Sequence, residues 1–238
     1  MTTSENLKRL ASTFTVRDIM VSVGDLVCAA HESEAASLSE AHPEFSFIPI
    51  RSGHRLSAYY SRHSHQPSQI GVPDLIGDGT GLLDLVEILE RRQFVFVLGP
   101  RQIDGYVHFS DLNHPLVKLT FHVLLEGLER FALDSVRSRL TEEYLKEGLG
   151  SPRFEQVQNF YRRAGDAGQS VINYLNIADA LKLARRAGTL DIDESVIRDV
   201  KDVRDGAAHV LENLVSGSRD VEKLAQVKRQ CLQVLRSS

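Results

Sequence analysis

The sequence predicts an α+β protein made of an N-terminal α/β domain and a C-terminal all-α domain. Two observations carry this prediction. Apolar runs before residue 117 are short and of strand length, whereas those after it recur with the period of a helix. The runs of the first part also come in pairs, which indicates an internal repeat. We expect the boundary near Asn113 to Pro115, which gives domains over residues 1–116 and 117–238.

The first domain is predicted to repeat one helix–strand–strand unit. Each pair of strands is joined by a polar link that contains glycine, R-S-G-H-R in the first pair and G-P-R-Q-I-D in the second, as hairpins require. A helical pattern precedes each pair, over residues 34–41 and 81–92. The four expected strands are Phe45 to Ile50, Leu56 to Tyr60, Phe94 to Leu98 and Gly105 to Phe109.

The second domain is predicted to contain about five helices. Apolar residues follow a helix period over three long stretches: residues 121–140, 171–181 and 197–214. The segments G-L-G-S-P, A-G-T-L-D-I-D and S-G-S interrupt the pattern and indicate helix ends. Gly188 follows Arg185 and Arg186, which makes it the expected C-cap of one helix.

The charge is distributed unevenly, but neither half is strongly basic. Residues 1–116 carry 9 Lys and Arg against 14 Asp and Glu, and residues 117–238 carry 19 against 18. A nucleic-acid-binding module defined by bulk charge is therefore excluded, and any contact with RNA must be local.

Several other classes are disfavoured by what the chain contains. No apolar run approaches the ~20 residues that cross a bilayer, and the first ten residues lack the apolar core of a secretory signal. We therefore expect a cytoplasmic protein that does not associate with a membrane.

Cys28 and Cys231 are far apart, which predicts two reduced, buried thiols. His63 and His65 have no companion ligands at metal-binding spacing, and we expect a solvated loop there and no metal.

The first domain resembles a pair of cystathionine-β-synthase-type (CBS) domains. The resemblance rests on T-V-R-D-I-M (15–20), on the repeat and on G-Y-V-H-F-S-D-L (105–112). It implies an adenine nucleotide bound between the repeats as a regulatory ligand, with Asp111 accepting hydrogen bonds from ribose hydroxyls and His108 and Phe109 beside it. His108 replaces the usual hydroxyl, and His63 stands at the acidic position of the first repeat, so one binding cleft is expected. Two alternatives remain: Asp111 caps the following segment, or the pair is purely structural or dimerising.

The second domain contains V-R-D-G-A-A-H-V, in which Arg204 and His209 are separated by four residues. In its helical context this motif resembles the HEPN domains of prokaryotic defence and toxin systems. The resemblance implies a homodimer, or a higher homo-oligomer, that cleaves RNA without a metal or other catalytic cofactor. His209 would transfer protons, Arg204 would stabilise the charge on the phosphate, and Asp205 would orient one of them or contact the ribose.

Helix geometry limits how one chain could use this motif. Two side chains five residues apart on a helix point about 140° away from each other. Gly206 between them allows the helix to loosen, and the resemblance implies a two-fold axis that places the pair of one protomer beside that of the other. The sequence leaves two functions open. One is a ligand-regulated, metal-independent endoribonuclease, and the other is a non-catalytic, nucleotide-responsive scaffold that keeps the same dimer contacts. A chance resemblance, in which Arg204 pairs with a neighbouring acid on the solvated face, is the third interpretation.

Overall fold

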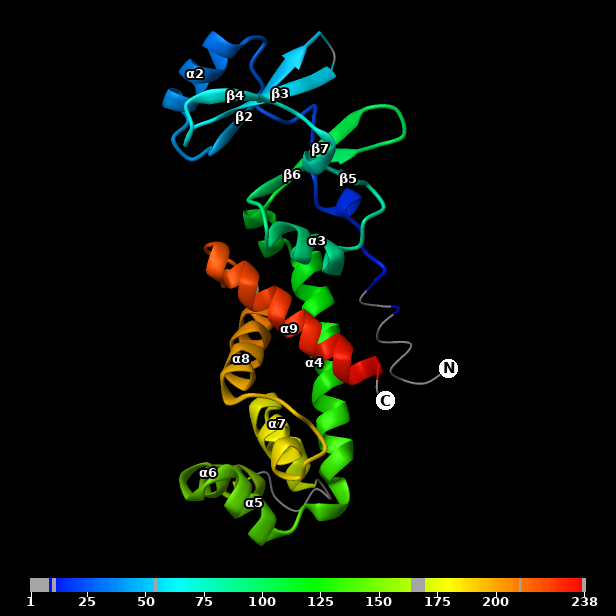
Figure 1. Ribbon diagram of the computed structural model, residues 1–238. Helices are drawn as coiled ribbons and strands as arrows, with labels where there is room; N and C mark the ends of the chain where they lie inside the picture. Colours follow the sequence, from blue (N-terminus) through cyan, green and yellow to red (C-terminus); the bar gives the residue numbers. More distant parts are fainter. Residues whose placement is uncertain (1–8, 10–11, 54, 164–169, 210, 237–238) are drawn as a thin grey trace. The chain divides into compact units, whose positions relative to one another are not determined.

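The computed structural model describes residues 9, 12–53, 55–163, 170–209 and 211–236. The chain divides into two compact units (Figure 1). The α/β unit spans Phe14–His114, and the helical unit contains the chain from Pro115 onward.

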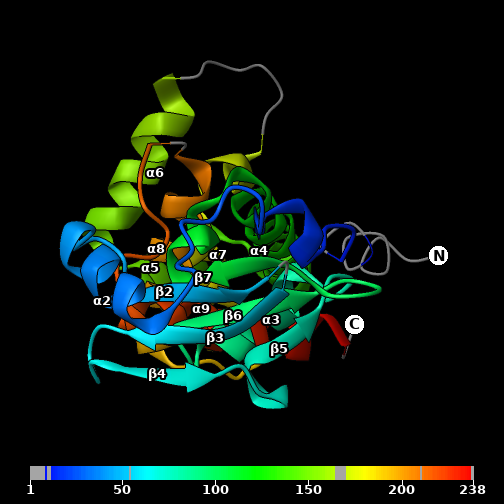
Figure 2. The same ribbon diagram turned by 90° about the horizontal axis from the view of Figure 1, so that it is seen from above.

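The α/β unit contains two sheets. One sheet has the strand order β1-β7-β6-β5, and the other has the order β2-β3-β4; the three strands of the second sheet lie side by side in Figure 2. The strands are β1 (Val21–Ser22), β2 (Phe47–Ser52), β3 (Arg55–Ser61), β4 (Gln66–Gln69), β5 (Leu75–Gly77), β6 (Phe94–Leu98) and β7 (Ile103–His108). The helices are η1 (Val16–Asp18), α2 (Glu32–Ala41), η2 (Val72–Asp74), α3 (Leu82–Leu89) and η3 (Phe109–Asn113).

The predicted helix–strand–strand repeat is confirmed. Helix α2 precedes the antiparallel pair β2–β3, in which Ile48 lies opposite Tyr60, and α3 precedes the antiparallel pair β6–β7, in which Phe94 lies opposite His108. The sequence patterns did not predict β1, β4 and β5. These strands have two to four residues each, and sequences such as Q-P-S-Q lack the apolar alternation that reveals a strand.

An aromatic cluster holds the two sheets together. Phe94 and Phe96 alternate along β6 and so project from one face of the sheet. The ring centroid of Phe94 lies 4.0 Å from that of Phe47 on β2 and 5.1 Å from that of Tyr59 on β3. Tyr106 on β7 stacks on Phe94 with the centroids 5.5 Å apart. Burial of these rings fixes the positions of β2 and β7, the two strands that carry the candidate site.

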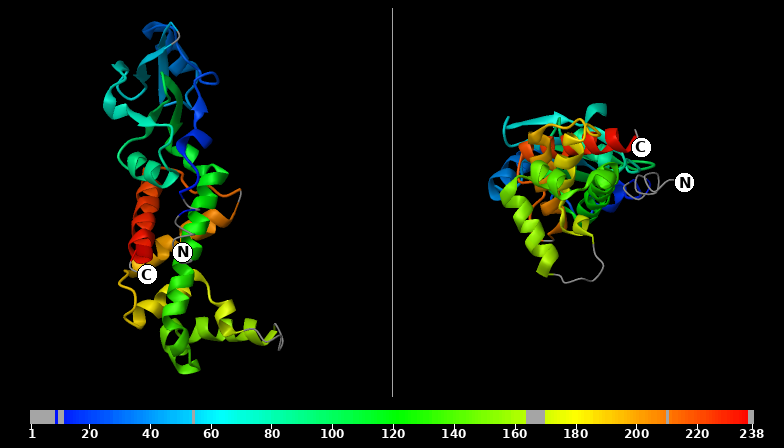
Figure 3. Two further views of the ribbon diagram at one scale, coloured as in Figure 1. Left: turned by 90° about the vertical axis from the view of Figure 1, so that its right-hand side faces the viewer. Right: turned by 90° about the horizontal axis from the view of Figure 1, so that it is seen from below.

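The helical unit is built around one long helix. Helices α7, α8 and α9 all pack on α4 (Figure 1), and the left view of Figure 3 shows α9, in red, beside α4, in green. The α-helices are α4 (Pro115–Val136), α5 (Glu142–Leu149), α6 (Ser151–Arg163), α7 (Ile177–Arg186), α8 (Glu194–Ala208) and α9 (Ser218–Arg236). The 3-10 helices η4 (Arg137–Arg139) and η5 (Val171–Tyr174) connect them.

The second unit is helical as predicted, but the helices begin and end at other residues than the sequence pattern indicates. The described part of this unit has six α-helices, where the sequence predicted about five. The stretch predicted as one helix over 171–181 is divided, because Asn176 caps a new helix through a hydrogen bond from the backbone N–H of Asp179. The C-cap of α7 is Ala187, one residue before the predicted Gly188, and Gly188 follows it with φ 70°, the left-handed conformation that glycine favours after a helix.

Two smaller expectations from the sequence have different outcomes. Cys231 is buried as predicted, but Cys28 is only partly buried, because it lies in the loop between β1 and α2 and not in an element. His63 and His65 are both exposed in the loop after β3. No helix among the described residues has the length and apolar character needed to cross a bilayer.

Candidate functional site

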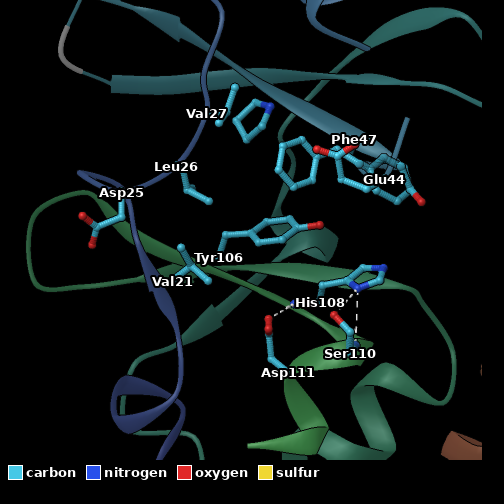
Figure 4. Close-up of a pocket in the computed structure, with 13 residues that line it drawn as sticks. Val21, Asp25, Leu26, Val27, Glu44, Phe47, Tyr106, His108, Ser110 and Asp111 are labelled. Atoms are coloured by element: carbon cyan, nitrogen blue, oxygen red, sulfur yellow. Dashed lines mark hydrogen bonds between the residues drawn. The ribbon is translucent and has the colours of Figure 1, made fainter. Parts of the chain in front are cut away.

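The α/β unit contains a cavity of about 450 Å³ (Figure 4). Its wall is largely apolar and aromatic, with a few polar side chains, which is the usual character of a small-molecule site. The lining residues are Val21, Asp25, Leu26, Val27, Glu44, Phe45, Ser46, Phe47, Pro49, Tyr106, His108, Ser110 and Asp111.

One wall of the cavity is formed by the end of β7 and the start of η3. Tyr106 and His108 are two positions apart on β7, so their side chains project from the same face of the sheet. The chain then turns into η3, where the Asp111 Oδ2 atom accepts a hydrogen bond of 2.8 Å from the His108 backbone N–H. This contact fixes the carboxylate of Asp111 at the cavity wall (Figure 4).

The opposite wall comes from segments far away in the sequence. Phe47 and Pro49 project from β2, and Leu26 and Val27 come from the loop after β1. In Figure 4 the ring of Tyr106 lies between Leu26 and Asp111. Together these side chains form an apolar slot with a carboxylate on one side.

Burial shifts the ionisation of the three groups on the β7 wall. Burial raises the pKa of Asp111, although the hydrogen bond from His108 N–H and the nearby His114 both oppose the shift. Burial, with a smaller contribution from the Asp111 charge, raises the pKa of the Tyr106 hydroxyl. Burial also lowers the pKa of His108, so this imidazole is neutral at neutral pH.

The tautomer of His108 follows from its hydrogen bonds. Its Nδ1 atom lies 2.8 Å from the Ser110 hydroxyl and 3.3 Å from the Ser110 backbone N–H, which can only donate. Nδ1 is therefore the acceptor, and the proton of the neutral ring is on Nε2. The Nε2 atom is buried and has no hydrogen-bond partner in the structure. A buried donor without a partner is costly unless a ligand satisfies it.

Of the three predicted nucleotide-binding residues, two line the cavity and one does not. His108 and Asp111 both line the cavity, whereas Phe109 is outside the set of lining residues and packs on the His108 ring with centroids 4.2 Å apart. Asp111 also closes the capping box of η3, so the alternative capping role is present as well.

Most of the residues that line the cavity were not predicted from the sequence. Tyr106 could have been found, because it alternates with His108 on the same strand. Leu26, Val27 and Phe47 line the cavity only because one repeat packs on the other. No local sequence pattern therefore identifies them as lining residues.

The predicted catalytic residues lie at the end of α8, and here the sequence prediction needs a correction. Helix α8 ends at Ala208, and His209 has the extended dihedral angles φ −103° and ψ 117°, so the angle of 140° expected on a continuous helix does not apply. The helical pattern predicted up to Leu214 is likewise wrong after Ala208, and Val210 lies outside the described residues.

Within one chain the side chains of Arg204 and Asp205 contact each other, and in the described part of the chain no side-chain contact joins them to His209. The Arg204 side chain is 42% exposed, and its Nη1 atom lies 3.8 Å from the Asp205 carboxylate. Asp205 also accepts a hydrogen bond of 2.8 Å from Lys201, one turn earlier. His209 is exposed, and its backbone carbonyl accepts a hydrogen bond of 2.9 Å from the buried Lys118 of α4. Lys118 also donates to the carbonyl of Glu212, which explains why the chain leaves the helix here.

Arg204 also lies close to an acid of α4. Burial raises the pKa of Glu129, and the charge of Arg204 is the largest opposing influence. Among the residues that the structure describes, no group of three or more His, Cys, Asp or Glu side chains is arranged to hold a metal ion.

Comparisons with known proteins find similarity only at the level of solved structures. No protein-family model matches the chain, and no curated protein matches it. The chain is similar to the CBS domain of a bacterial CNNM/CorC family Mg2+ transporter in complex with ATP, at 16% identity and a TM-score of 0.38 over 48% of this chain and 94% of that chain. It is also similar to a hemolysin-like CBS-domain protein of Oenococcus oeni PSU, at 11% identity and a TM-score of 0.36 over 47% of this chain and 96% of that chain.

Proposed function

We propose that the α/β unit binds an adenine nucleotide in the cavity and that this ligand regulates the helical unit. The observation that carries the proposal is the position of Asp111. Its Oδ2 atom is held by the His108 backbone N–H, which leaves Oδ1 to accept a hydrogen bond from a ribose hydroxyl. The apolar slot between Tyr106, Leu26 and Phe47 is suited to a planar base.

A substitution of Asp111 tests nucleotide binding. Asp111→Asn keeps a side-chain oxygen for the His108 N–H but removes the charge, and we expect AMP binding to weaken about ten-fold or more because hydrogen bonds to charged groups are the stronger ones. Asp104→Asn is the matched control, since Asp104 lies on the same strand but does not line the cavity. If purified wild-type protein shows no heat of binding with AMP, ADP or ATP, the proposal is wrong.

We further propose that the helical unit is a metal-independent endoribonuclease whose site forms between two copies of the chain. Arg204 and His209 are both accessible to solvent, and each has a side chain suited to phosphoryl chemistry. No side-chain contact joins Arg204 to His209 in the described part of one chain, so this proposal requires a second copy. Asp205, which is held by Lys201, would orient Arg204.

Cleavage of RNA in the presence of a chelator tests this part. Wild-type protein should produce 2′,3′-cyclic phosphate ends, and His209→Ala should abolish cleavage. Because the His209 side chain is exposed, we expect the substitution to change the free energy of unfolding by less than about 0.5 kcal/mol, so lost activity would not reflect lost folding.

A non-catalytic scaffold is the second candidate. It is favoured by the ion pairs of Arg204 and Asp205 and by the backbone contact between His209 and Lys118, since all three residues already have structural roles. This candidate predicts that wild type and His209→Ala are equally inert toward RNA while a nucleotide still changes the oligomeric state.

A further inference from the structure

The acidic and polar side chains of the cavity suggest which part of a nucleotide it recognises. Three carboxylates line it, those of Asp25, Glu44 and Asp111, and none of the lining residues, all of which are described by the structure, is a lysine or arginine. A phosphate group inside this cavity would face like charges with no cationic lining side chain to offset them.

Arg62 lies close to one of these acids, and it is already engaged. The Arg62 guanidinium donates to the backbone carbonyl of Pro43 and acts on the charge of Glu44. Glu44 also contacts His42, with 3.1 Å between its Oε1 atom and the ring Nδ1 atom. These contacts offset part of the negative charge of Glu44. Asp25 and Asp111 have no lysine or arginine beside them among the residues that line the cavity.

A second and independent observation is the buried Nε2–H group of His108. His108 lines the same cavity, and its Nε2–H group has no partner and is held in the donor tautomer by Ser110. A ligand that contacts this group would satisfy it by presenting a hydrogen-bond acceptor. The ring nitrogens of adenine and the oxygens of ribose are neutral acceptors of this kind.

We propose that the cavity recognises the nucleoside part of its ligand, with a neutral acceptor on the His108 Nε2–H and a ribose hydroxyl on Asp111, and that the phosphates stay outside and add no affinity. The ligand class is thus an adenine nucleoside or its monophosphate and not specifically a di- or triphosphate. This inference rests on the proposed nucleotide-binding function.

Calorimetric titration of the full chain with adenosine, AMP and ATP, each with chelator and with Mg2+, tests the charge argument. Adenosine should bind at least as tightly as ATP under both conditions. If ATP binds more than ten-fold tighter than adenosine in either condition, the inference is overturned while nucleotide binding stands. If none of the three binds, both proposals fail.

Two substitutions of His108 test the donor separately from the fold. In His108→Asn the amide oxygen replaces Nδ1 as the acceptor that caps η3, but the buried donor is lost, and we expect adenosine affinity to fall about ten-fold. In His108→Gln the side-chain amide reaches the position of Nε2, and affinity should stay within about three-fold of wild type. Equal affinity of wild type and His108→Asn, with both proteins unfolding at the same temperature, would overturn the role of the donor.

Discussion

The buried ammonium group of Lys118 donates a hydrogen bond of 2.9 Å to the backbone carbonyl of His209, across 91 positions of sequence. This contact ties the segment after α8 to the long helix α4. The His209 carbonyl is bonded to α4 and not to a further turn of α8. The contact therefore determines where His209, the predicted catalytic histidine, lies.

Replacement of Lys118 by methionine should loosen this segment. The side chain keeps its length and apolar stem but loses the donor for the carbonyls of His209 and Glu212, and we expect a loss of about 1–3 kcal/mol in the free energy of unfolding. Urea denaturation of Lys118→Met beside the exposed control Lys146→Met measures this. Equal losses in the two variants would contradict the role of the buried amine.

The ion pair between Arg153 and Asp179 should be the most sensitive in the helical unit. Arg153 Nε lies 3.1 and 3.0 Å from the two carboxylate oxygens of Asp179, whose side chain is only 6% exposed. Arg153→Met leaves this carboxylate without its cation, and we expect about 3–5 kcal/mol of destabilisation.

An exposed pair provides the comparison for Arg153. Arg130→Met removes one of the two basic partners of Asp134 on the surface of α4, leaves the other, Arg137, in place and should cost less than about 1 kcal/mol. The prediction fails if chemical denaturation gives the two methionine variants the same stability.

The cavity also depends on close packing of β1 on β7. A Cβ atom at Gly105 would lie 2.5 Å from Met20 Sδ and 3.0 Å from the Val21 carbonyl oxygen, so Gly105→Ala must move the Met20 side chain and presses on β1 at Val21, a residue of the cavity wall. We expect about 1–3 kcal/mol of destabilisation and weaker nucleoside binding. Gly79→Ala is the control, because a Cβ atom there meets nothing within 4 Å, and both its stability and its affinity should match wild type.

Stability should depend on pH through Asp111. Its pKa is raised in the folded state by burial, so its contribution is fully present below the ordinary carboxyl pKa of about 4 and is lost as pH rises through the folded value. Tyr106, His108 and His114 face the same carboxyl. Without ligand, the stability of wild type relative to Asp111→Asn should therefore decline from acidic to neutral pH. Paired denaturation curves across this range would show it, and a constant difference would contradict it.

Charge removal at the cavity should alter ligand preference. In the double variant Asp25→Asn, Glu44→Gln, two of the three carboxylates are neutral, and metal-free ATP should gain affinity relative to adenosine because repulsion of its phosphates is reduced. Titration with both ligands measures the ratio. An unchanged ratio would show that these carboxylates do not exclude phosphate.

Local patterns in the sequence predict most of the elements but not how they meet. The strand F-V-F-V-L is predicted from its short apolar run and β-branched and aromatic composition, and the helix around Leu85 from the period of its apolar residues. The end of α8 was misplaced because the cause, Lys118, lies on another helix. Asp111 and His108 could be proposed because they lie in one local motif. The opposite wall of the cavity could not be predicted, because its residues come from other segments of the chain.

Both outer strands of the three-stranded sheet contain a proline, Pro49 in β2 and Pro67 in β4. Proline has no backbone N–H, so neither edge presents an unbroken row of donors to an incoming strand. The sheet is thereby protected against edge-to-edge aggregation. If copies of this protein assemble, extension of this sheet into a filament is therefore disfavoured.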